Sequence, residues 1–135
     1  MITVETTINA DIVTVWDCWT KPEHITKWNF ASDDWHCPKA ENDLKNKGKF
    51  SWRMEAKDGS MGFDYSGTYL DVMKHECISL KMDDGRRAEI EFFEDDEYTT
   101  ISETFEAEDS HSEEQQRAGW QAILENFKKY VESVK

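Results

Sequence analysis

The first part of the chain predicts a strand followed by two short helices. Residues 2–8 alternate between apolar and polar positions, which is the two-residue period of a half-buried strand. Asp11 then offers a helix cap, and the residues that follow at the spacing of one helix face are Ile12, Val15, Trp16 and Trp19. Pro22 is well placed in the first turn of a second helix that ends near Trp28.

From about Trp35 to Phe105 the pattern changes to that of short strands. The alternating runs cover residues 50–56, 63–69, 78–82, 88–92 and 99–105. Turn residues separate them, including Asp58-Gly59 and Asp84-Gly85, and Asp-Gly favours tight hairpins. Strands this close in sequence predict an antiparallel meander with one apolar face that needs a cover.

The C-terminal segment predicts that cover. Ser112 and Gln115 have the spacing of a capping box, and a long helix over about 113–134 follows. Its apolar stripe consists of Trp120, Ile123, Leu124, Phe127, Val131 and Val134. We therefore expect an α+β protein with a helix-grip fold, in which a curved antiparallel sheet (β-α-α-β6-α) wraps around a long C-terminal helix. No linker interrupts the pattern, so residues 1–135 are expected to form a single domain.

The amino-acid composition and the net charge limit which classes of partner the protein is expected to bind. The six Trp, seven Phe, five Met and four Tyr concentrate the apolar content in large side chains, which pack less regularly than branched aliphatics. The 16 Lys and Arg residues face 29 Asp and Glu residues, giving a net charge of −13. A field of that sign repels phosphate backbones and anionic membrane surfaces. Nucleic acid and membrane are therefore not expected as partners, and the oligomeric state is left open.

The cysteines and histidines predict neither a disulfide framework nor a metal site. There are three cysteines and no CxxC pair, which favours a reducing compartment. His36-Cys37, with His24 upstream, lacks the paired short spacings of zinc ligands. No signal peptide or long apolar run is visible. We expect a cytoplasmic protein with no cofactor, no metal and no catalytic residue.

The aromatic side chains of the sheet's concave face and of the long helix form the main candidate site. Strand parity and helix spacing place them opposite one another, where bulky rings leave gaps that a ligand can fill. The alternative is that the same rings fill a solid core. The candidate ligand-binding residues are Trp28, Trp35, Trp52, Met54, Phe63, Tyr65, Tyr69, Met82, Arg86, Glu103, Trp120, Leu124 and Phe127.

Glu103 stands out among these candidates because it lies between Ile101 and Phe105 on the inward face of the last strand. A buried carboxylate must either pair or take up a proton. Arg86 shares the parity of the neighbouring strand and is the expected partner. The pair could orient a polar ligand head or supply an acid or base; the alternatives are a structural ion pair or a bulge that turns Glu103 outward.

Three motifs resemble a known superfamily. Val15–Glu23 resembles its opening helical Val-Trp followed by Thr and a Pro-Glu step, and Gly67-Thr68-Tyr69 with Val72 resembles its fourth-strand motif. Gly119–Leu124 resembles the signature that begins its long helix. Together they resemble the START-like, or birch-pollen-allergen-like (SRPBCC), superfamily. The branch is that of the C-terminal domain of the homologue of the activator of the 90-kDa heat-shock protein ATPase.

The resemblance implies a hydrophobic cavity between sheet and helix, since relatives include lipid binders, polyketide cyclases and co-chaperone domains. We expect a small-molecule binding protein for a hydrophobic or amphipathic ligand. The alternatives are a chaperone-interacting module and an enzyme of the cyclase or hydrolase type. In the eukaryotic co-chaperone a separate N-terminal domain makes much of the chaperone contact. These 135 residues leave no room for it, so weak chaperone engagement is expected.

Overall fold

The computed structural model describes residues 1–135 as one antiparallel sheet and three helices. The strands are β1 (Ile2–Ile8), β2 (Trp35–Asn42), β3 (Lys49–Ala56), β4 (Gly62–Met73), β5 (Cys77–Met82), β6 (Arg87–Asp95) and β7 (Tyr98–Phe105). The helices are α1 (Ile12–Thr20), α2 (Pro22–Trp28) and α3 (Glu113–Val134). The seven strands lie in the order β1-β7-β6-β5-β4-β3-β2, so the chain meanders from β2 to β7 and β1 closes one edge.

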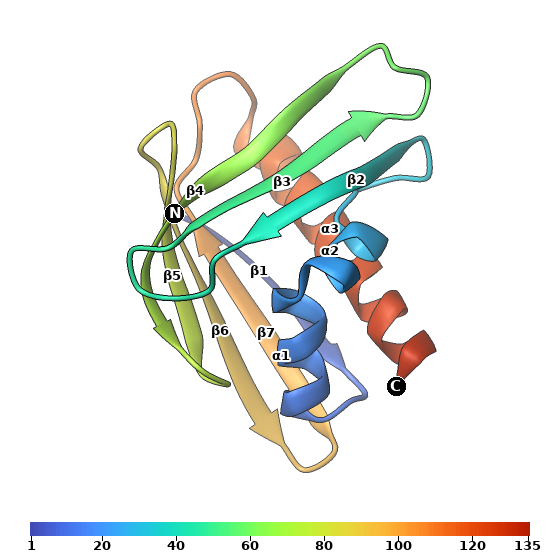
Figure 1. Ribbon diagram of the computed structural model, residues 1–135, viewed down its shortest axis with the longest axis vertical. Coiled ribbons are helices and arrows are strands. Elements are labelled where there is room, and N and C mark those ends of the chain that lie inside the picture. The colour runs from blue at the N-terminus through green and yellow to red at the C-terminus, as the bar shows by residue number, and fades with distance from the viewer.

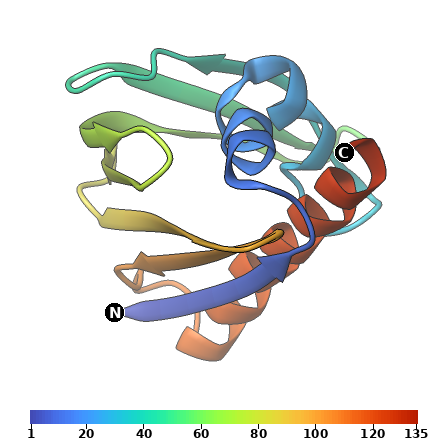
Figure 2. The ribbon, with the colours of Figure 1, turned by 90° about the horizontal axis from the view of Figure 1, so that it is seen from below.

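The sheet curls strongly around the helices. Figure 1 shows its two wings, one formed by β2, β3 and β4 and the other by β5, β6, β7 and β1, with α1 and α2 in front of α3. Seen from below, the sheet has the outline of a letter C, and α3 lies across its open side (Figure 2). The helix-grip fold and the element order predicted from the sequence are confirmed.

Local signals in the sequence fix where these elements begin and end. The Asp11 side chain accepts a hydrogen bond from the backbone N–H of Thr14 at 3.1 Å. The predicted capping box between Ser112 and Gln115 is present at the start of α3. Both Asp-Gly turns have their glycine at positive φ, 78° at Gly59 and 95° at Gly85, a conformation that an L side chain would strain.

Two irregularities shape the wing that contains β2, β3 and β4. A Cβ at Gly67 would lie 2.3 Å from the backbone oxygen of Lys81, so β4 and β5 approach closely only because this residue is glycine. In β2 the pairing with β3 shifts by one residue between His36 and Lys39, which forms a bulge around Pro38.

The core lies between the concave face and the helices, and α3 does not fill all of it. The side chains of Leu124, Phe127 and Val131 are fully buried along one face of α3. The main neighbours of this helix are β1, α1 and α2 rather than β3 or β4. Only side chains span the space between the N-terminal half of α3 and the β3–β4 hairpin. None of the three helices combines the length and the apolarity that crossing a membrane requires.

A candidate ligand cavity

A cavity of about 170 Å³ occupies the space between α3 and the β3–β4 hairpin. Of its 16 lining residues, 13 are hydrophobic. They come from five strands, all three helices, the residue after α2 and the turn before β6: Trp19, Trp28, Asn29, Phe50, Trp52, Met54, Phe63, Tyr65, Tyr69, Ile78, Leu80, Arg86, Ile90, Glu103, Trp120 and Ile123. The cavity is partly open to solvent on one side, where Phe63 is about half exposed.

Aromatic rings in edge-to-face and tilted contacts form most of the cavity wall. The Trp52 and Tyr65 rings are 5.6 Å apart, and Tyr65 meets Trp120 of α3 at 6.1 Å. Trp120 in turn stacks on Phe105 at 3.7 Å. Rings in such contacts hold one another in place, so the wall is preorganised around the empty space.

Nine of the thirteen predicted residues line this cavity: Trp28, Trp52, Met54, Phe63, Tyr65, Tyr69, Arg86, Glu103 and Trp120. The other four lie elsewhere: Trp35, Met82, Leu124 and Phe127. Leu124 and Phe127 face the sheet but are fully buried further along α3. Met82 is buried at the far end of β5, and Trp35 packs on Phe63 outside the cavity. Periodicity shows which face of a strand or helix a residue occupies, but it does not show whether that residue lies beside the cavity.

The set of candidates omitted seven lining residues: Trp19, Asn29, Phe50, Ile78, Leu80, Ile90 and Ile123. Ile78 and Leu80 belong to an alternating strand run, so their inward direction was visible in the sequence. Asn29 follows α2 and carried no such signal. It is 3% exposed and its side-chain nitrogen donates to the Cys37 sulfur at 3.8 Å.

Glu103 faces inward as predicted, but it has no partner. It pairs in the sheet with Val4 and Ile90, and it is only 7% exposed. Its carboxyl makes no hydrogen bond or ion pair with another residue. Loss of hydration therefore raises its pKa from an ordinary value of 4.5 to about 8, so the carboxyl is mostly protonated at neutral pH.

The predicted ion pair between Arg86 and Glu103 is wrong. Glu103 lies opposite Ile90, four residues beyond Arg86, and four residues of strand span about 13 Å. The Arg86 guanidinium instead donates to the Asp84 carboxylate at 2.9 Å and to the backbone oxygen of Glu106 at 3.3 Å. Both Arg86 and Glu103 line the cavity, but at separate places.

Two further polar groups of the wall lack hydrogen-bond partners. The Trp52 indole nitrogen is buried and donates to nothing. The Tyr65 hydroxyl also makes no hydrogen bond. Its pKa is raised well above the usual range, mainly because the hydroxyl is buried and to a smaller extent because the Glu103 charge is nearby. The Tyr69 hydroxyl differs, because it donates to the Asn42 side-chain oxygen.

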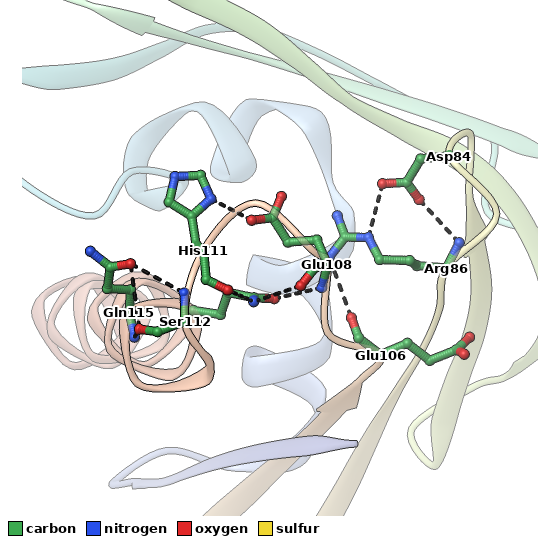
Figure 3. Close-up of polar contacts among 8 residues, drawn as sticks. Asp84, Arg86, Glu106, Glu108, His111, Ser112 and Gln115 are labelled. Carbon is green, nitrogen blue, oxygen red and sulfur yellow. Dashed lines mark hydrogen bonds and ion pairs between the residues drawn. The ribbon is translucent and has the colours of Figure 1, made fainter.

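A polar surface cleft of about 230 Å³ adjoins the cavity at the N-terminal end of α3. Arg86 and Trp120 line both spaces and separate them. Figure 3 shows Arg86 between Asp84 and the 106–111 segment, whose Glu108 carboxylate meets the His111 ring. Gln116 of α3 donates to the backbone oxygens of Glu108 and His111 and so fastens this segment to the helix.

The three cysteines lie outside the cavity. Burial raises the pKa of Cys18 to about 11 and also raises that of Cys37. A raised thiol pKa lowers the thiolate fraction, which disfavours a nucleophilic role.

The comparisons with known proteins agree with this architecture. The model of the family "Activator of Hsp90 ATPase homolog 1-like protein" matches residues 9–132. An AHSA1-like protein from Aeromonas hydrophila, solved by NMR, is 44% identical, with 98% of this chain and 93% of that chain covered and a TM-score of 0.89. Protein Chr148 from Cytophaga hutchinsonii is 47% identical, with 98% and 92% covered and a TM-score of 0.84.

Protein CV1439 from Chromobacterium violaceum is only 20% identical, with 97% of this chain and 96% of that chain covered, and its TM-score of 0.82 shows a shared fold alone. No curated protein matches the chain. Because the family model spans most of the sequence, the chain belongs to the family of Activator of Hsp90 ATPase homolog 1-like proteins. The resemblance stated from the sequence is thereby confirmed.

Proposed function

We propose that this protein binds a small hydrophobic or amphipathic molecule in the cavity between α3 and the β3–β4 hairpin. The observation that carries the proposal is an aromatic-walled space that contains polar groups without partners. Most ligand sites combine an apolar wall with a few polar groups that fix the ligand's orientation. In this chain the cavity lies where α3 and the β3–β4 hairpin are not in close contact.

The volume of the cavity limits the size of the ligand that it can hold. Sites for drug-sized molecules usually measure about 300–1,000 Å³, well above the 170 Å³ found here. An engineered apolar cavity of about 150 Å³ accepts benzene. The resting cavity therefore suits a compact ring, and a larger ligand requires the wall around Trp120 to move.

The alternatives have less support. An acid–base enzyme built on Glu103 and Arg86 loses its basis, because the two side chains do not meet. A chaperone-interacting module is supported by the description of the family alone.

Binding is tested with a compact hydrocarbon. Toluene titrated into uniformly ¹⁵N-labelled protein is expected to cause saturable, one-to-one shifts of the indole N–H signals of the cavity tryptophans. Ile123→Phe fills the cavity from α3 and is expected to abolish these shifts. Val134→Phe, on an exposed part of the same helix, is the matched control and leaves them unchanged. Shifts that do not saturate, or that survive Ile123→Phe, would contradict the proposal.

The chaperone alternative has its own measurement. Added at micromolar concentration to the 90-kDa heat-shock protein of its own source, the chain is expected to change the ATPase rate by less than twofold. Stimulation that saturates with this chain alone, and that persists in Ile123→Phe, would place its function on the surface rather than in the cavity.

A further inference from the structure

Three polar groups in the cavity wall lack partners within the protein. They are the Glu103 carboxyl of β7, the Tyr65 hydroxyl of β4 and the Trp52 indole N–H of β3. Each would form at least one hydrogen bond in an ordinary protein interior. Glu103 is more than nine-tenths buried, and Tyr65 lies close enough for its titration to respond to the Glu103 charge.

All three groups can donate a hydrogen bond, and the Trp52 indole can do nothing else. Tyr65 stays protonated in its buried site, and the protonated Glu103 carboxyl carries a hydroxyl that can point into the cavity. An apolar pocket in which a tyrosine and a neutral carboxylic acid donate together is known to recognise an oxygen on a ring. The cavity wall therefore has the donor chemistry to bind an acceptor atom of a ligand.

We propose that Trp52, Tyr65 and Glu103 form a donor set that selects a compact cyclic ligand carrying a carbonyl or similar acceptor oxygen. This inference rests on the proposed function, because it names the ligand class of the same cavity. The alternative ligand class is an organic cation, which an ionised Glu103 and the surrounding aromatic faces would bind. The guanidinium of Arg86 also lines the cavity but is paired with Asp84 at 2.9 Å, so the wall offers such a cation no unpaired negative charge while Glu103 is protonated.

The test uses three ligands of nearly the same shape: cyclohexanone, methylenecyclohexane and cyclohexylamine. They place a carbonyl, a carbon–carbon double bond or an ammonium on the same six-membered ring. Dissociation constants are measured by calorimetry or NMR titration at pH 7. Because the three ligands differ in hydration, the informative quantity is how each affinity changes between variants of the protein.

Tyr65→Phe and Glu103→Met each remove a donor and are expected to weaken cyclohexanone binding about tenfold while leaving methylenecyclohexane within about twofold. Glu103→Gln keeps an N–H donor at the same position and is expected to retain most of the ketone affinity. Tyr98→Phe is the matched control, since the Tyr98 side chain is exposed and does not line the cavity. The Trp52 indole proton, assigned with Trp52→Phe, is expected to move downfield with the ketone only.

Other outcomes overturn the inference. Equal loss of ketone and hydrocarbon affinity in these variants would mean that the three side chains only shape the cavity. Tight cyclohexylamine binding that Glu103→Gln abolishes would identify a cation site. In both cases the proposed function stands and the donor set fails. If none of the three ligands binds, and toluene does not bind either, the proposed function fails as well.

Discussion

The two halves of the protein's interior are built from the same kinds of side chain but are packed differently. In the packed half, which we define by Trp16, Phe92, Leu124, Phe127 and Val131, every side chain is at most 5% exposed and none lines the cavity. In the hollow half, defined by Phe50, Trp52, Tyr65, Glu103 and Trp120, the aromatic contacts enclose empty space.

The position of α3 explains the difference. Its C-terminal half lies against α1 and α2, and Phe127 meets the rings of Trp19 at 5.0 Å and Trp28 at 4.7 Å. Toward the β3–β4 hairpin no backbone comes close, and aromatic side chains reach across instead. An abundance of large rings therefore does not by itself make a cavity. The cavity arises where α3 stands away from the β3–β4 hairpin and only side chains span the distance between them.

Truncation in each half gives the largest expected contrast. Phe127→Ala should lower the free energy of unfolding by about 3–5 kcal/mol, because it empties a closely packed site. Trp120→Ala should cost only about 1–2 kcal/mol, since Trp120 already borders two open spaces and loses mainly its stacking on Phe105. Chemical denaturation of both variants measures the two costs. Equal costs would mean that the hollow half is as tightly packed as the other.

The hollow half should also make stability depend on pH. The folded protein holds the Glu103 proton up to about pH 8, whereas the unfolded chain releases it near pH 4.5. The contribution of Glu103 to stability is therefore fully present below pH 4.5 and is lost as pH rises toward 8. Relative to wild type, Glu103→Gln should become more stable by about 2–4 kcal/mol between pH 5 and pH 8.

Urea denaturation of both proteins at several pH values measures this difference. The control is Glu89→Gln, which removes a charge from an exposed position of β6. Tyr65 faces the same cavity as Glu103 and stays protonated in this range, because burial raises its pKa well above the usual value. A constant difference between wild type and Glu103→Gln would show that the carboxyl is hydrated.

The smallest expected effect comes from Arg86→Ala at the boundary between the cavity and the polar cleft. The variant loses a partly exposed pair with Asp84, so its cost should be at most about 1 kcal/mol. In a double-mutant cycle with Glu103→Gln the two costs should add within about 0.5 kcal/mol, because the side chains do not meet. A larger coupling would restore the ion pair expected from the sequence.

The sequence carried enough information for the fold because its signals are local. Pro22, the Ser112–Gln115 capping box and the two Asp-Gly turns act within a few residues of themselves, and the structure has helix starts and tight turns at those positions. Strand alternation also placed Glu103 on the inner face, where it is buried. Each of these features depends on the backbone of one segment.

The site was harder to predict because it depends on register and on where helix and sheet separate. Parity put Arg86 and Glu103 on one face but could not reveal the four-residue offset between them. The stripe of α3 predicted that Trp120 and Phe127 both face the sheet, yet only Trp120 reaches the cavity. That difference follows from the tilt of α3 toward β1, which no local pattern encodes.

The bulge in β2 has a consequence for how molecules of this protein meet one another. β2 is an outer strand of an open sheet, and such a strand can template pairing with a strand of another chain. Pro38 has no backbone N–H to donate, and the bulge interrupts the regular spacing of the other backbone N–H groups of β2. The charged side chain of Lys39 is exposed next to the bulge. The strand that borders the hollow half is thus poorly suited to seed a continuous intermolecular sheet. A protein with an incompletely filled interior is thereby protected from edge-to-edge association.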